Sequence, residues 1–198
     1  MPDKHHRRSI RLRGYDYTQS GAYFVTIVTQ GREPLFGDVV DGEMVLSVYG
    51  RVAVTMWRRI PRHFPHVELD EWVVMPNHIH GIIAIMDVVR GRGDAFPAKH
   101  SGELGSAHGE TSIASQVPDG ECVAPTGPPS GSLGAIVGNF KSVVTRRINR
   151  MRKTSGARVW QRNYYERIIR NERELNAVRQ YIHDNPVHWR DDTENLAA

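Results

Sequence analysis

The sequence predicts an α+β protein with a ferredoxin-like or palm-type antiparallel sheet and helices packed mainly on one face. Strand-like apolar runs alternate with amphipathic, helix-like runs along the chain. Two of the strand-like runs are separated by only a short turn, which favours antiparallel pairing. The expected order is β-α-β-β, a long polar insertion, then α-β-α, which suits a sheet covered by helices.

In the first half, residues 46–60 carry apolar side chains at helical spacing, and Pro61 is expected to end that helix. The flanking runs are rich in β-branched and aromatic side chains, which favour strands. Pro76-Asn77 suits a turn between two of them. The strand candidates are residues 22–29, 67–75 and 78–86.

In the second half, Ser132 can cap a helix that runs to about Met151 and carries one apolar stripe. Residues 159–169 are aromatic and β-branched enough for a strand or an extended pair. Asn171 caps a last helix, with Glu174 at the supporting position of a capping box. The stripe consists of Leu133, Ile136, Val137, Phe140, Val144, Ile148 and Met151.

One segment differs in composition from the rest. Residues 91–131 hold eight of the 18 glycines and five of the 11 prolines, without a periodic apolar pattern. Such a segment cannot bury enough surface to offset the entropy of ordering it. We therefore expect one domain over residues 1–198, with a disordered insertion at 87–131 and a flexible basic arm at 1–14.

The charge pattern favours a polyanionic partner. Residues 131–170 contain ten Lys or Arg against one acid, although the net charge is only +4. Nucleic acid is the commonest polyanion, and a solvated basic face is the alternative that charge alone leaves open. The basic candidates for DNA contacts are Arg7, Arg8, Arg11, Arg13, Lys141, Arg146, Arg147, Arg150, Arg162 and Arg167.

Composition also bears on the setting of the protein. No apolar run approaches eighteen residues, so no membrane span is expected. Cys122 is the single cysteine, so no disulfide can form within the chain, which is typical of a reducing cytoplasm. Within the basic, aromatic run after Trp160, Tyr164 or Tyr165 could stack on an unpaired base, and core packing is the alternative for either.

His78 and His80 form the first candidate site. Alternate residues of a strand share a face, so both imidazoles point the same way while Ile79 turns into the core. Two adjacent imidazoles are a ready pair of metal ligands. The apolar run that follows indicates a central strand. Burying two polar imidazoles there is costly, which favours a functional role for the pair.

The second candidate site lies on the last helix, where Tyr181 and Asn185 are one turn apart on the same face. A tyrosine hydroxyl can attack phosphorus if charge is neutralised at the phosphate. A divalent ion held by His78 and His80 would do this, and Asn185 is placed to add a polar ligand.

Four segments, in this order, resemble single-tyrosine HUH transposases of the REP-associated branch: RLRGYDYTQSGAYFVTIVTQ, MPNHIHGII, SLGAIVGNFKSVVTRRIN and WQRNYYERIIRNERELNAVRQYIHDNPVHW. MPNHIHGII resembles the HUH motif itself, and the other segments are similar to the start, middle helix and C-terminal signature of that branch. The resemblance covers the chain except residues 87–131.

This resemblance implies that His78 and His80 bind Mg²⁺ or Mn²⁺, with Asn185 in the place of a third ligand. It implies that Tyr181 attacks single-stranded DNA, leaving a 5′-phosphotyrosine and a free 3′-hydroxyl that allow strand transfer. The implied substrates are hairpins of repetitive extragenic palindromes, bound by a monomer or a homodimer. A bacterial cytoplasmic, nucleoid-associated protein is expected.

Two alternatives stay open. A regulatory protein on the same fold could bind such hairpins without cleaving them. An unrelated two-histidine phosphoesterase could act through metal-activated water, but such a metal site would require acidic ligands near the histidines. Asp70, Glu71 and Asp87 are the nearest acids in the sequence, and they lie beyond the central stretch of the strand.

Overall fold

The computed structural model describes residues 14–87 and 127–195 of the 198-residue chain, and these belong to one compact unit. The basic arm with Arg7, Arg8, Arg11 and Arg13 lies outside the described residues, as does the predicted insertion from residue 88 to 126. The division into a single domain, an arm and an insertion stays a prediction. Within the described residues, no helix is long and apolar enough to cross a bilayer.

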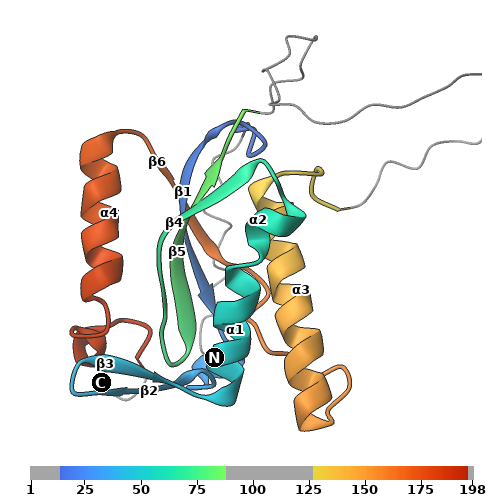
Figure 1. The fold of residues 1–198 in the computed structure, drawn as a ribbon, viewed down its shortest axis with the longest axis vertical. Coiled ribbons are helices and arrows are strands. Elements are labelled where there is room, and N and C mark those ends of the chain that lie inside the picture. Colours follow the sequence, from blue (N-terminus) through green and yellow to red (C-terminus); the bar gives the residue numbers. More distant parts are fainter. Residues whose placement is uncertain (1–13, 88–126, 196–198) are drawn as a thin grey trace, which may run out of the picture. The chain divides into compact units, whose positions relative to one another are not determined.

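A four-stranded antiparallel sheet forms the centre of this unit (Figure 1). Its strand order is β4-β5-β1-β6, so β5 and β1 are interior strands. The strands are β1 (Gly21–Val28), β4 (Val67–Val74), β5 (His78–Ile85) and β6 (Tyr165–Ile169). The predicted α+β class is confirmed, and the two histidines lie on an interior strand.

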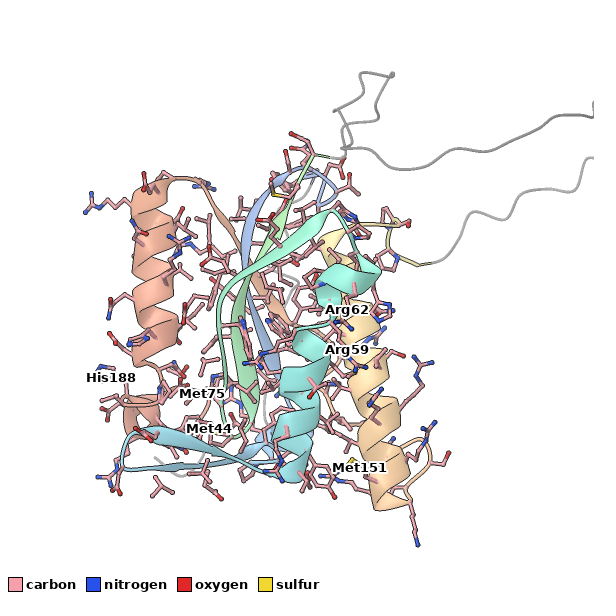
Figure 2. All side chains as sticks on the ribbon, viewed as in Figure 1. Met44, Arg59, Arg62, Met75, Met151 and His188 are labelled. Atoms are coloured by element: carbon pink, nitrogen blue, oxygen red, sulfur yellow. The ribbon has the colours of Figure 1, made fainter. Side chains whose placement is uncertain are left out.

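Three helices cover one face of the sheet (Figure 1): α1 (Val48–Trp57), the short α2 (Ile60–His63) and α3 (Leu133–Arg152). The larger apolar core lies between them and the sheet, and Trp57 is fully buried in it. Gly81 of β5 is necessary there, because a Cβ at this position would approach Trp57 to 2.4 Å. The predicted stripe of α3 is buried up to Ile148, whereas Met151 is exposed at the helix end (Figure 2).

Among the described residues, the other face carries one helix, α4 (Glu172–Asp184), as Figure 1 shows. A smaller apolar cluster joins it to the sheet, built from Phe24, Ile82, Ile169, Val178 and Ile182. The described helices therefore lie mainly on one face, as expected, and α4 packs on the face to which His78 and His80 point.

Side-chain caps set the helix starts. The Ser132 hydroxyl accepts from the Ala135 amide at the start of α3, and Asn171 Oδ1 accepts from the Glu174 amide in α4. The capping box differs from the prediction, because the Glu174 carboxylate accepts from the amide of Arg170, one residue before the cap. The Glu174 side chain thus extends the cap into the preceding turn.

Some elements were not predicted. A β-hairpin of β2 (Gly37–Val40) and β3 (Glu43–Leu46) precedes α1, and short 3-10 turns, η1 and η2, cover Gln30–Arg32 and Trp189–Asp191. The expected helix over 46–60 is shorter, because the Ser47 hydroxyl caps α1 at Val48. Pro61 lies in the first turn of α2, where its missing N–H costs no helical hydrogen bond.

Candidate metal and nucleophile site

Strand β5 presents His78 and His80 on the α4 face of the sheet. In the register with β1, His80 lies opposite Thr26 and His78 opposite Val28. Both imidazoles are almost completely buried, and their ring centroids are 4.3 Å apart. The alternation of strand residues thus places two ligand-type side chains together, with Ile79 in the large core on the opposite face.

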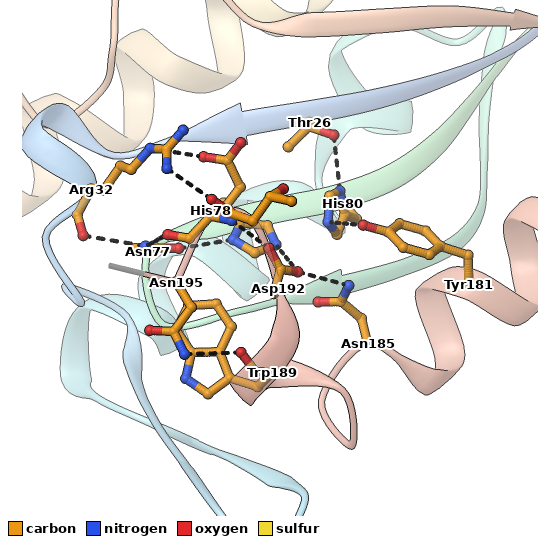
Figure 3. Close-up of polar contacts among 12 residues, drawn as sticks. Thr26, Arg32, Asn77, His78, His80, Tyr181, Asn185, Trp189, Asp192 and Asn195 are labelled. Carbon is orange, nitrogen blue, oxygen red and sulfur yellow. Dashed lines mark hydrogen bonds and ion pairs between the residues drawn. The ribbon is translucent and has the colours of Figure 1, made fainter. Parts of the chain in front are cut away.

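Each imidazole is oriented through its Nδ1 atom (Figure 3). His78 Nδ1 lies 2.8 Å from Asn77 Oδ1, and His80 Nδ1 lies 2.9 Å from the Thr26 hydroxyl. Because Asn77 Oδ1 can only accept, the proton of His78 is on Nδ1 and its Nε2 carries a lone pair. This is the arrangement in which polar neighbours orient metal-ligating histidines.

Helix α4 adds Tyr181 and Asn185 from the other side (Figure 3). The Tyr181 hydroxyl lies 3.2 Å from His80 Nε2, although the two residues are 101 positions apart in the sequence. Tyr181 also packs edge-on against Phe24, and half of its surface (49%) is exposed. An accessible phenol hydroxyl therefore lies beside the outward-facing nitrogen of a buried histidine.

Asp192 is a member of the site that the sequence did not reveal. Its carboxylate lies 4.0 Å from His78 Nε2 and accepts from Asn185 Nδ2 at 3.2 Å. His78, His80 and Asp192 each offer one ligand atom, and these atoms lie within 4.8 Å of one another. No periodicity or spacing links residue 192 to the histidines, because the turn after α4 brings it there.

Burial controls the protonation states. It lowers the pKa of His78 to about 4 against the opposing charge of Asp192. Burial also lowers the pKa of His80 well below its usual range, and the neighbouring His78 adds to the effect. Burial and then the Asp192 charge raise the pKa of Tyr181. At neutral pH the two imidazoles are therefore uncharged and the phenol is protonated.

The donor set fits a divalent cation. His78 Nε2 and Asn185 Oδ1 are buried, and neither has a hydrogen-bond partner among the described residues. Buried polar atoms without partners are costly, and a bound cation would satisfy both lone pairs. Two imidazole nitrogens with amide and carboxylate oxygens suit several divalent ions, including Mn²⁺.

The predicted DNA-contacting residues of α3 do not converge on this site. Arg146, Arg147 and Arg150 are exposed on α3, which covers the opposite face of the sheet (Figure 1). Lys141 differs from the expectation of an exposed cation, because its Nζ donates to the carbonyls of Gln161 and Arg162 at 2.7 and 3.1 Å. Burial lowers its pKa to about 8. Lys141 therefore fixes the chain before β6.

A hollow of about 560 Å³ lies between α3 and residues 156–162, and Arg146 and Arg162 are among its lining residues. Arg167 lies elsewhere, on β6 opposite Phe24, where it pairs with Glu174 of α4. The structure thus brings Arg146 and Arg162 to one hollow and places Arg167 on the α4 face.

The two neighbouring tyrosines are separated by the sheet. Tyr164 packs against the large core, whereas Tyr165 lies opposite Thr26 and packs edge-on against Phe24 on the α4 face. Tyr165 is 39% exposed. Of the pair, Tyr164 is the one held by core packing, and Tyr165 is the better placed for stacking on a base near Tyr181.

The family model described as IS200-like transposase matches residues 125–185, which reach from before α3 to Tyr181 and Asn185. The chain belongs to the IS200-like transposase family. This confirms the family recognised from the sequence and gives the chain a DNA-processing role.

A similar protein comes from Haemophilus influenzae and is described as uncharacterized. It is 40% identical to this chain over 189 residues, which are 95% of this chain and 92% of the relative. The similarity to this relative therefore extends well beyond the region of α3, β6 and α4 that the family model matches.

One solved structure shows the shared fold. A REP-associated tyrosine transposase bound to a REP hairpin superposes with a TM-score of 0.54 at 18% identity, covering 90% of this chain and 73% of that one. A transposase-like protein of Deinococcus radiodurans matches 88% of this chain and 95% of its own, at 16% identity and a TM-score of 0.42. The first comparison establishes that the fold is that of the REP-associated branch.

Proposed function

We propose that this transposase cleaves and rejoins single-stranded DNA at hairpins of palindromic repeats, through a metal-dependent step and a 5′-phosphotyrosine intermediate. The observation that carries the proposal is the 3.2 Å contact between the Tyr181 hydroxyl and His80 Nε2. The contact supports the proposal because an accessible phenol hydroxyl lies beside the atom through which His80 would hold a metal ion.

His78 Nε2, His80 Nε2 and Asn185 Oδ1 would hold Mg²⁺ or Mn²⁺, and Asp192 would add a carboxylate oxygen. Such an ion would polarise the phosphoryl oxygen and offset the charge that develops on the phosphate. The neutral state of both histidines supports this role, because only an unprotonated imidazole nitrogen can act as a ligand.

Tyr181 would supply the nucleophilic oxygen. Its oxygen forms a bond to the phosphorus while the bond from phosphorus to the 3′-oxygen breaks. The phenol proton is lost and the 3′-oxygen takes up a proton, so the products are a 5′-phosphotyrosine and a 3′-hydroxyl. Because the phosphodiester bond energy is retained in the tyrosine link, a second 3′-hydroxyl can reverse the step and join another strand.

The substrate follows from the family and from the shape of the site. The solved REP-associated relative is bound to a REP hairpin. In this chain the nucleophile is exposed on the α4 face, while exposed arginines lie on α3 across the sheet. A hairpin could therefore be held by phosphate contacts on one part of the protein while an unpaired strand reaches Tyr181.

Asp192 favours a second candidate function. The sequence placed no acid close to the histidines, and the structure places this carboxylate 4.0 Å from His78 Nε2. A two-histidine, one-carboxylate site can activate water for phosphodiester hydrolysis. Such a phosphoesterase would not need Tyr181, which distinguishes it from the proposed transposase chemistry.

A denaturing gel tests the proposal. The full chain is mixed with labelled single-stranded hairpin oligonucleotides from palindromic repeats and Mn²⁺, and a covalent protein–DNA adduct is sought. We expect the adduct with the wild type and its loss in Tyr181→Phe and in His78→Ala. Tyr49→Phe and His183→Ala should retain it, because Tyr49 contacts Arg152 of α3 and His183 is an exposed α4 residue outside the donor set.

Two other outcomes would contradict this function. Cleavage that persists in Tyr181→Phe would indicate the metal-activated water mechanism. Hairpin binding without any adduct, across several repeats and with both Mg²⁺ and Mn²⁺, would indicate the non-catalytic hairpin-binding protein.

A further inference from the structure

The residues that follow α4, 186–195, turn back toward β5 and carry Asp192 to the histidines (Figure 3). Local backbone hydrogen bonds shape this segment into a run of turns that includes η2 (Trp189–Asp191), with the Asp192 amide donating to the Trp189 carbonyl at 3.3 Å. Long-range contacts to the rest of the protein attach these turns beside the histidines.

Arg32 makes two of these contacts with its side chain. Its Nε lies 3.1 Å from the Glu194 carboxylate, and its Nη1 donates to the Thr193 carbonyl at 2.9 Å. Both side chains of the ion pair are largely shielded from solvent, with exposed fractions of 22% and 17%. The Arg32 guanidinium therefore binds residues 193 and 194, which directly follow Asp192.

The backbone carbonyl of Arg32 is connected through Asn77 to His78. Its carbonyl accepts from Asn77 Nδ2 at 3.2 Å, and the same nitrogen donates to the Glu194 carbonyl at 2.6 Å. Asn77 Oδ1 in turn orients His78 through Nδ1. Arg32 is therefore linked both to the segment that carries Asp192 and to the amide that orients His78.

The conformation of Arg32 is itself unfavourable. Its φ of 55° lies in the left-handed region, which residues with a Cβ adopt at an energetic cost. Such a conformation persists when surrounding contacts compensate for it, as the contacts to Thr193, Glu194 and Asn77 do here.

We propose that Arg32 is a positioning residue that holds segment 186–195 in place, so that Asp192 completes the metal site as an oxygen ligand. This inference rests on the proposed metal site of His78, His80 and Asn185. Groups that orient metal ligands commonly change metal affinity by about 10–100-fold when they are replaced. Arg32 lies in the loop between β1 and β2, which begins at Gly37, so a loop remote in sequence from α4 would set the affinity of the site.

The experiment measures Mn²⁺ affinity of the full chain by titration, with electron paramagnetic resonance of the free ion as the readout. Asp192→Asn, Arg32→Ala and Glu194→Gln should each weaken binding, by roughly tenfold for the two residues that act through position. Arg51→Ala is the matched control, because Arg51 is an exposed arginine whose side chain donates to the Leu46 carbonyl and makes no contact with the site.

Two further variants separate positioning from folding. Glycine adopts a positive φ without strain, so Arg32→Gly removes the side chain and retains the backbone conformation. A loss of Mn²⁺ affinity in this variant would therefore reflect the lost side-chain contacts with segment 186–195. Combining Arg32→Glu with Glu194→Arg should restore part of the affinity that each change alone removes. Hydrogen exchange of residues 186–195 should rise in Arg32→Gly without metal, while exchange in α3 stays unchanged.

The possible failures are distinguishable. Wild-type protein that binds no Mn²⁺ would overturn the proposed function together with this inference. Wild-type binding with equal affinity in Arg32→Gly would overturn only the role of Arg32. Tighter binding in Arg32→Gly would also overturn it, because segment 186–195 would then obstruct the site.

Discussion

The two faces of the sheet differ in how their side chains are used. The face under α1 and α3 is closed by a large apolar core around Trp57. The face under α4 has a small apolar cluster at one end and two buried histidines beside it. In β5 this contrast arises within one strand, because Ile79 and His80 are neighbours that point to opposite faces.

The two faces therefore contribute differently, the α3 face mainly to stability and the α4 face to the candidate site. Burial on the α3 face is mainly that of apolar side chains, whose removal from water stabilises the fold. Burial on the α4 face keeps two imidazoles uncharged and leaves polar atoms without partners, which opposes stability in the absence of a cation. Substitutions on the two faces should therefore have separable effects on folding and on chemistry.

The largest expected effect on stability is that of Trp57→Ala. This residue is fully buried against β5, α3 and Trp72, so its truncation should lower the free energy of unfolding by about 3–5 kcal/mol. Urea unfolding measures it. Under conditions in which the variant is folded, Mn²⁺ affinity should match the wild type, and a large loss of affinity would show that the faces are not separable.

Ile182→Ala makes the corresponding change on the α4 face. Ile182 is fully buried in the smaller cluster, next to Tyr181 in the helix, and we expect a loss of about 2–3 kcal/mol. Because this contact also holds α4 against the sheet, the rate of adduct formation by the folded variant should fall as well. An unchanged rate would mean that other contacts position Tyr181.

The histidines should make stability depend on pH. The native pKa of His78, about 4, lies below its ordinary value, so the unfolded chain takes up a proton first as the pH falls. Above about pH 6.5 this histidine therefore does not lower the free energy of unfolding. As the pH falls from there toward 4, the free energy of unfolding decreases by at most about 1.4 kcal/mol per pH unit.

Urea unfolding at pH 7 and pH 5, with chelator present, measures this dependence. His78→Asn should show a shallower decline than the wild type, since one buried titrating group is removed. Identical declines would indicate that His78 is not held neutral by burial.

The smallest expected effect is on DNA binding across the sheet from Tyr181. Arg146→Ala removes one exposed cation beside the hollow at residues 156–162. The slope of log affinity against log salt should decrease by about 1 if Arg146 contacts one phosphate. Arg173→Ala, on the exposed side of α4, is the comparison, and an equal decrease in both would argue against a specific role for α3.

The sequence predicted the elements whose residues repeat with a clear period. The stripe of α3 is of this kind and is confirmed from Leu133 to Ile148, and the continuous apolar run of β5 likewise marked a buried strand. The β2–β3 hairpin was missed because its strands have four residues each and several of their valines are exposed, so no buried alternation marks it. Leu46, which was expected to begin the helix, ends β3 instead, because Ser47 caps α1 at Val48.

The site was only partly predictable for a similar reason. His78 and His80 are separated by one residue, and Tyr181 and Asn185 by one helical turn, so local geometry brings each pair together. The position of Asp192 depends on the turn η2 and on the contacts that Arg32 makes with the segment after Asp192. Neither follows a period in the sequence. Whether Tyr164 or Tyr165 faces the site depends on the register of an edge strand, and a shift of one residue reverses it.

The most direct test of the central claim is to digest the covalent adduct and identify the modified peptide by mass spectrometry. The account predicts a nucleotide linked through its 5′-phosphate to Tyr181, and a free 3′-hydroxyl on the released strand. Attachment to Tyr164 or Tyr165, or cleavage that leaves a free 5′-phosphate and no modified peptide, would contradict it.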